Sequence, residues 1–181
     1  MHRSVRRAVT AVTAGAAAVA ASLAILAAGT AEAAAAPRFP APEPYGTNIQ
    51  DDPGHDFSKA IHSRRDGILR GWVTYYDAKH GTAEYKPIAW TIGKKGGKVT
   101  GYFADPGEYV VMNYRSHVSP KAELYSARNC DGGKVTVNSR GLGTKRCGKA
   151  ALTAHLKAGK RPALITVHRG EIVRIQEIFV P

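Results

Sequence analysis

From Ile68 onward the sequence consists of short runs of β-branched and aromatic residues, which glycine, aspartate and proline interrupt at short intervals. Such runs fit a pleated, half-buried surface, whereas the residues between them favour tight reversals of the chain. The pattern predicts a mainly β protein of antiparallel strands, either a jelly-roll-like β-sandwich or a barrel. The strands are expected at residues 68–76, 84–92, 98–103, 108–115, 122–126, 134–138, 162–168 and 171–180.

Two segments carry helical patterns. Asp56 is suited to cap a short N-terminal helix over residues 57–65, in which apolar side chains four residues apart share one face. Residues 150–158 are ambiguous, because their leucines alternate as in a strand while their alanines and the following Gly159 suit a helix. A helix at this second place would make the fold α+β.

The N-terminal residues have the three parts of a secretory signal peptide. Three arginines precede an uncharged, alanine-rich stretch at residues 8–28, and Ala31-Glu32-Ala33 has the small-x-small pattern that precedes a cleavage site. We therefore expect residues 1–33 to be removed on export, with no membrane span left in the mature protein. The expected location is extracellular, and the alanine-rich signal favours a bacterial source.

Cleavage at this place would leave a chain of ordinary domain size. Residues 34–56 are rich in proline and alanine, which predicts a flexible leader, and residues 57–181 are expected to form a single β-rich domain. Cys130 and Cys147 are the only cysteines, so in an oxidising compartment they should form one disulfide. We expect a monomer with no cofactor and no metal site.

Positive charge is concentrated near the carboxyl end. The formal net charge of the chain is +12, and residues 132–170 contain nine lysines and arginines but no acidic residue. A basic surface attracts polyanions because binding releases their counterions, although the same charge can serve only to keep a protein soluble. The cations expected to bind are Lys145, Arg146, Lys149, Lys157, Lys160 and Arg161. The expected partner is a polyanion or glycan of the cell envelope or extracellular medium, with nucleic acid as a further polyanion.

Aromatic residues follow one another closely on the expected strands, and alternation prevents all of them from facing the core. Trp72 and Tyr76 are the ones expected to stack on a ligand, as exposed aromatic rings do on sugars. Gly-Tyr-Phe at 101–103, Pro-Gly-Glu-Tyr-Val at 106–110 and Leu-Lys-Ala-Gly-Lys at 156–160 precede two closing strands. This order resembles that of jelly-roll carbohydrate-binding modules, which implies a sandwich that binds glycans.

Histidines near carboxylates are the main route by which this chain could catalyse a reaction. A small secreted nuclease or toxin needs one group that removes a proton, another that returns it, and a cation that stabilises the transition state. His80 with Glu84, and separately His168, are the candidates. We expect binding without catalysis. The alternatives are a secreted nuclease or toxin-like hydrolase, and a protein-binding module such as a protease inhibitor.

Overall fold

The computed structural model describes residues 38–95, 98–105, 107 and 113–181. Within these residues the chain is mainly β and contains one α-helix, as the sequence predicts for its fold class. The strands are β1 (His55–Asp56), β2 (Ser63–Arg64), β3 (Gly67–Asp77), β4 (Thr82–Pro87), β5 (Ala89–Lys95), β6 (Lys98–Ala104), β7 (Tyr114–Ser126), β8 (Lys145–Cys147), β9 (Ala163–His168) and β10 (Glu171–Glu177), and the helix is α1 (Lys149–Ala158). No helix in the described part of the chain is long and apolar enough to cross a membrane.

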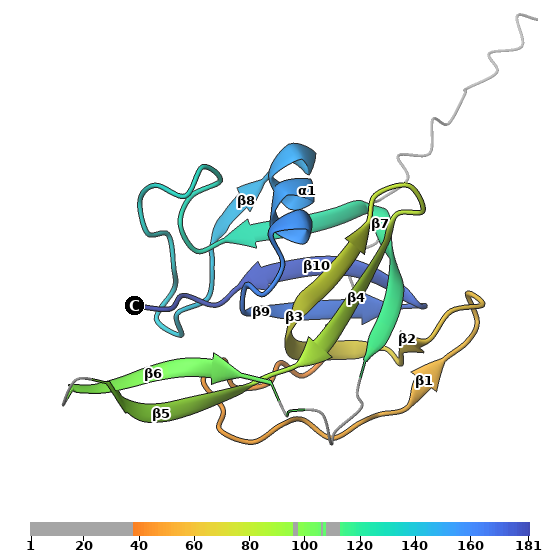
Figure 1. The fold of residues 1–181 in the computed structure, drawn as a ribbon. Coiled ribbons are helices and arrows are strands. Elements are labelled where there is room, and N and C mark those ends of the chain that lie inside the picture. Colours follow the sequence, from red (N-terminus) through yellow and green to blue (C-terminus); the bar gives the residue numbers. More distant parts are fainter. Residues whose placement is uncertain (1–37, 96–97, 106, 108–112) are drawn as a thin grey trace, which may run out of the picture. The chain divides into compact units, whose positions relative to one another are not determined.

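Five strands close into a barrel (Figure 1). Strand β3 pairs antiparallel with both β4 and β9, while β4 continues to β7 and β9 to β10. A parallel pairing between β7 and β10 completes the cycle, and the short β8 adds to the far part of β7. Closure gives each of the five strands two hydrogen-bonded neighbours, so none of the five is an edge strand.

Alternating side chains fill the barrel and also form a second cluster outside it. Ile165 on β9 belongs to the main core, whereas its neighbour Leu164 belongs to the second cluster, because successive side chains of a strand point to opposite faces. The second cluster also holds Phe103 and Trp90, whose ring centroids lie 4.9 Å apart. This cluster attaches the β5–β6 hairpin, whose two strands pair only with each other among the described residues.

The ambiguous segment at residues 150–158 is helical. Helix α1 buries Leu152, His155 and Leu156 on one face, which packs against β3 and β7. The helix ends at Gly159, which has a φ of 60° and donates its N–H to the carbonyl of His155. Glycine adopts this left-handed conformation at little cost, so it suits the position after the last helical turn.

The prediction of a helix at residues 57–65 is wrong. Strands β1 and β2 pair antiparallel there, and turns and bends lie between them. The Ser63 hydroxyl lies 2.6 Å from the hydroxyl of Ser116, and Ser63 and Arg64 are buried. A nine-residue segment has too little local helical stability to compete with such tertiary contacts.

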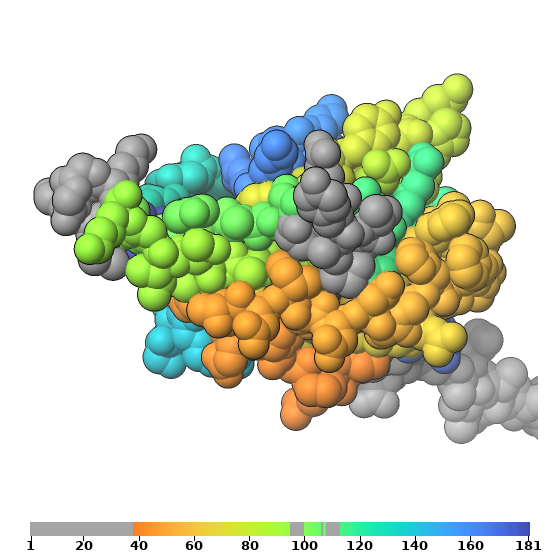
Figure 2. Space-filling model, turned by 60° about the horizontal axis from the view of Figure 1, so that its bottom comes forward, coloured from red at the N-terminus to blue at the C-terminus, as the bar shows by residue number. Residues whose placement is uncertain are grey.

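Residues 38–56, expected to form a flexible leader, lie extended against the domain. The Tyr45 hydroxyl donates a hydrogen bond to the carbonyl of Phe179 at 2.7 Å. The buried guanidinium of Arg70 donates to two backbone carbonyls of this segment. In Figure 2 the segment (orange) runs across the surface beside the β5–β6 hairpin (green). These contacts make it part of the packed structure.

Other expected strands agree with the structure to different extents. Strands β3 and β6 cover the stretches predicted for them, and β7 includes the one expected at 122–126. Strand β9 begins one residue after the predicted start at 162, and β10 ends at Glu177, three residues before the predicted end at 180. The stretch at 84–92 is divided between β4 and β5 at Ile88, which is fully buried in the second cluster and donates its N–H to the carbonyl of Arg70. No strand forms at 134–138, where the chain makes one isolated bridge, and residues 108–112 lie outside the described part. The predicted disulfide between Cys130 and Cys147 is confirmed.

Candidate functional site

A basic hollow lies between α1, the β3–β4 hairpin and the middle of β7. Its volume is about 840 Å³, and we call it the basic groove. The basic side chains that line it are Lys79, His80, Lys121, Arg146 and Lys149. The described residues of its lining include no acidic side chain. Basic groups from distant parts of the sequence therefore meet around one hollow.

The fold brings these side chains together from four elements. The β3–β4 hairpin carries Lys79 and reverses at Gly81, whose φ is 62°. Lys121 lies on β7 between the two stretches in which that strand pairs with β10. Arg146 is on β8, whose end is held by the disulfide, and Lys149 begins α1. The amino end of a helix adds partial positive charge from its free N–H groups.

Much of the charge of the basic groove is unneutralised. Arg146 pairs with Glu123 at 2.9 Å, and both side chains belong to the sheet beside the groove. The exposed ammonium groups of Lys79, Lys121 and Lys149 have no ion-pair partner among the described residues. Uncompensated cations around a concave surface reinforce one another's field, so an anion is favoured there.

The structure separates the six predicted binding cations into two groups. Arg146 and Lys149 line the basic groove, and Lys145 is adjacent to Arg146 on β8 but does not line it. Lys157 and Lys160 lie at the other end of α1. Arg161 also lies there, and its guanidinium is 3.7 Å from the carboxylate of Glu177.

The two predicted stacking residues also have different surroundings. Tyr76 lines the basic groove and is partly buried against the main core. Trp72 packs against the second cluster, and its indole N–H is buried without a hydrogen-bond partner among the described residues. Tyr75, which was not predicted to bind, is more exposed than Tyr76 or Trp72, at 55%.

The carboxylate that contacts His80 is that of Asp77. The His80 Nδ1 donates to Asp77 Oδ2 at 2.6 Å, and this hydrogen bond lowers the pKa of the Asp77 carboxyl below its ordinary value. Glu84 instead lies near the guanidinium of Arg115, with 4.0 Å between Glu84 Oε1 and Arg115 Nη1. His168, the other predicted candidate, forms a separate pair with Asp66 at 2.8 Å beside the β9–β10 turn.

Sequence reasoning noted Asp77 and Lys79 beside His80 but chose Glu84 as the partner of the histidine, and it did not single out Arg115 or Lys121. The spacing Asp-x-x-His in a hairpin loop was a usable signal for Asp77, because an aspartate there can cap the turn and reach the histidine. Lys121 and Arg115 carry no comparable local signal. Their position depends on how β7 pairs with β4 and then with β10.

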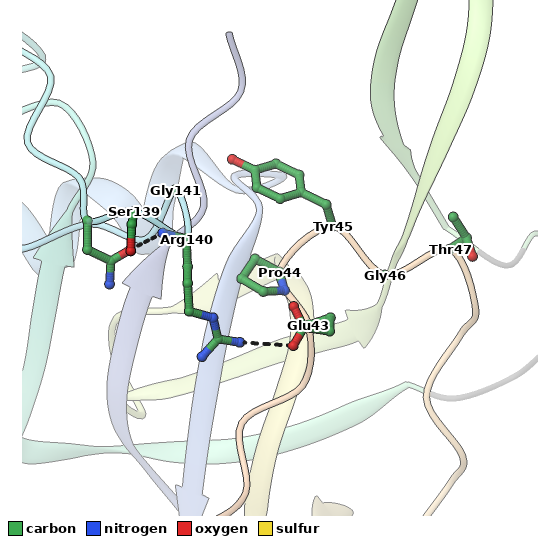
Figure 3. Close-up of a pocket in the computed structure, with 9 residues that line it drawn as sticks. Glu43, Pro44, Tyr45, Gly46, Thr47, Ser139, Arg140 and Gly141 are labelled. Atoms are coloured by element: carbon green, nitrogen blue, oxygen red, sulfur yellow. Dashed lines mark hydrogen bonds and ion pairs between the residues drawn. The ribbon is translucent and has the colours of Figure 1, made fainter.

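A second hollow, of about 790 Å³, lies between residues 43–47 and the loop at 138–141 (Figure 3). Its two charged side chains, Arg140 and Glu43, point toward each other and lie 3.6 Å apart. The Glu43 carboxylate therefore neutralises the positive charge of Arg140 inside this hollow. The basic groove therefore has the stronger attraction for an anionic ligand.

The described residues contain no group of three or more histidine, cysteine, aspartate or glutamate side chains that could hold a metal ion. Comparisons with protein-family models, curated proteins and solved structures find no match to this chain.

Proposed function

We propose that this protein is exported and binds an anionic polymer of the cell envelope or its surroundings in the basic groove. The observation that carries this proposal is the convergence of five basic side chains on one hollow whose described lining contains no acidic residue. Three of them are lysines without an ion-pair partner in the described part of the chain. An acidic glycan, a wall polymer or a nucleic acid would each supply the required charge.

The size of the groove favours a segment of polymer over a small ion. Its volume of about 840 Å³ lies in the upper part of the range of pockets that hold ligands of several rings, roughly 300–1,000 Å³. Each phosphate or sulfate that contacts a lysine would release counterions, so the affinity would fall steeply as the salt concentration rises.

The topology of the barrel supports a binding site in the same region of the molecule. We interpret the barrel as one of the OB type, in which β3, β4, β7, β9 and β10 are the first to fifth strands. Barrels of this type bind oligonucleotides and oligosaccharides on their second and third strands and on the loops after the first and fourth. The loop after the first strand is here the hairpin that carries Lys79 and His80. Fold-level analogy supports the location of the site but does not identify the ligand.

Chromatography on immobilised heparin tests the proposal. The double substitution Lys121→Ala/Lys149→Ala removes two groove lysines and should lower the salt concentration at which the protein elutes. Lys94→Ala/Lys134→Ala is the matched control, because it removes the same charge from exposed positions outside the groove. Equal elution of the two double variants would contradict the proposal, since net charge alone would then explain binding.

A further inference from the structure

We infer that the outer face of β3, β4 and β7, beside the basic groove, cleaves RNA, with Glu84 and His80 acting on either side of Arg115. The inference rests on the proposed function, because the groove would hold the RNA chain next to this face. The β3–β4 hairpin belongs to both places: it lines the groove with Lys79 and His80 and carries Asp77 at its start. Sequence alone favours binding without catalysis, and the placement of Arg115 is what changes this expectation.

Strand pairing places six side chains on one face in two neighbouring rows. The rows are Tyr75, Glu84 and Arg115, and next to them Asp77, Thr82 and His117. Residues two apart on a strand share a face, and directly paired residues of adjacent strands point the same way. The opposite face of the same strands carries buried residues such as Ala83 and Tyr85, so the two rows point away from the core.

The guanidinium of Arg115 lies between the two carboxylates of this face. Its Nη1 is 4.0 Å from Glu84 Oε1, and its Nη2 is 3.7 Å from Asp77 Oδ2. Hydrogen bonds from Nε and Nη2 to the Thr82 hydroxyl, at 3.3 and 3.1 Å, fix its plane. Both carboxylates are farther away than in a close bidentate pair, and a guanidinium has five N–H donors. A phosphate can therefore bind to Arg115 with Glu84 on one side and His80 on the other.

The Asp77–His80 pair gives the imidazole a defined role. Its Nδ1 is engaged by Asp77, so Nε2 remains as the nitrogen that can exchange a proton with a substrate. Asp77 is a positioning residue, because it acts through His80. Tyr75, in the same row as Glu84 and 55% exposed, offers a ring on which a base can stack.

These groups match the cleavage of RNA by its own 2′-hydroxyl. The Glu84 carboxylate accepts the 2′-hydroxyl proton, and the 2′-oxygen forms a bond to phosphorus while the bond from phosphorus to the 5′-oxygen breaks. His80 donates its Nε2 proton to the departing 5′-oxygen, and Arg115 stabilises the charge on the phosphoryl oxygens. The products are a 2′,3′-cyclic phosphate and a 5′-hydroxyl, and proton exchange with water returns Glu84 and His80 to their starting states.

The experiment uses the purified protein and a fluorescein-labelled single-stranded oligoribonucleotide, with cleavage followed by gel and end groups by mass spectrometry. We expect cleavage with 2′,3′-cyclic phosphate ends, and no cleavage of the DNA oligonucleotide of the same sequence. Glu84→Gln and His80→Ala should each lower the rate about 100-fold or more, as loss of general acid–base catalysis does. His168→Ala removes a histidine from a similar aspartate pair elsewhere and should change the rate less than twofold.

Fluorescence anisotropy with the same oligonucleotides separates this inference from the proposed function. RNA that is bound but not cleaved would overturn the inference and leave polyanion binding in place. RNA that is neither bound nor cleaved would overturn the inference, and the heparin elution described above would then decide the proposed function by itself. Equal cleavage of DNA would exclude attack by the 2′-hydroxyl. Full activity in Glu84→Gln and His80→Ala, or equal loss in His168→Ala, would also overturn the assignment. A melting temperature equal to that of the unsubstituted protein confirms that each variant is folded.

Discussion

The imidazole of His155 donates a hydrogen bond to the carboxylate of Glu177 across 2.9 Å, where the buried face of α1 meets the end of β10. The second carboxylate oxygen of Glu177 accepts from the Ser126 hydroxyl at 2.7 Å and from the Ala127 N–H at 2.8 Å. One buried carboxylate thus joins α1, the end of β7 and the end of β10. It anchors the helix that forms one wall of the basic groove.

The hydrogen bonds of Glu177 predict that the folded protein loses stability in acid. Burial raises the pKa of Glu177, but the hydrogen bonds from His155, Ser126 and the Ala127 N–H outweigh it and lower the pKa to about 2. A carboxyl whose pKa is lower in the folded state than in the unfolded state stabilises the fold fully above about pH 4.5, its unfolded value, and loses this contribution as the pH falls toward 2. The contribution is on the order of 3 kcal/mol.

Urea unfolding between pH 2 and 7 measures this contribution. The unsubstituted protein should lose it between about pH 4.5 and 2, whereas Glu177→Gln should be less stable at pH 7 and should depend less on pH in that range. Glu43→Gln, at an exposed glutamate, is the control and should keep the acid dependence. Identical pH dependence in Glu177→Gln and the unsubstituted protein would contradict the prediction.

The disulfide predicts that the double variant Cys130→Ser/Cys147→Ser is less stable and binds polyanions more weakly. The bond closes a separation of 17 residues, so its loss should cost about 3 kcal/mol in the chain-entropy model. It also holds the end of β8, on which Arg146 reaches the basic groove. Urea unfolding and heparin elution of the oxidised protein and the double variant check both effects. An unchanged elution position in the double variant would contradict the second effect, because the groove would then keep its affinity without the disulfide.

Gly101→Ala should destabilise the attachment of the β5–β6 hairpin. A β-carbon at Gly101 would overlap the indole of Trp90, which packs on Phe103 in the second cluster. Overpacking of this kind costs roughly 1–3 kcal/mol. Gly148→Ala is the control, because nothing lies within 4 Å of the added carbon. Thermal unfolding followed by tryptophan fluorescence should show a lower midpoint for Gly101→Ala, and equal midpoints in the two variants would contradict this packing.

Asp77→Asn tests the positioning role of Asp77 in RNA cleavage. Asparagine keeps an oxygen that can accept the backbone N–H groups of Lys79 and His80, as Asp77 Oδ1 does at 3.0 and 3.1 Å, but it removes the charge facing the imidazole. We expect kcat to fall about tenfold or more, with KM and the melting temperature little changed. A rise in KM at constant kcat would assign Asp77 to binding, and a lower melting temperature would make its role structural.

Local patterns in the sequence predicted the parts of the fold that depend on neighbouring residues. The alternation along β3 and the turn at Arg169-Gly170 could be recognised within about ten residues. At residues 150–158 the same patterns left strand and helix open, and the structure has a helix there. The same reasoning failed at residues 57–65, where contacts with Ser116 decide the structure. Local patterns do not encode such long-range pairing.

The candidate site could be predicted only in part for the same reason. Arg146 and Lys149 were expected because they belong to the acid-free C-terminal region, and His80 because a carboxylate lies nearby in the sequence. Lys121 and Arg115 could not be assigned, because they reach their places through the pairing of β7 with two different strands. The sequence also could not show that Lys157 and Lys160 lie at the other end of α1 from Lys149 and do not line the groove.

The salt dependence of binding tests the central claim, that the groove lysines act together on an anionic polymer. The measurement is the dissociation constant of a single-stranded DNA oligonucleotide as a function of salt concentration, by fluorescence anisotropy. For Lys121→Ala/Lys149→Ala the slope of log Kd against log salt should fall by about 1.4, since each phosphate contact on a single strand contributes about 0.7. The slope of Lys94→Ala/Lys134→Ala should stay as in the unsubstituted protein. Slopes that are equal in all three proteins would contradict a binding site in the groove.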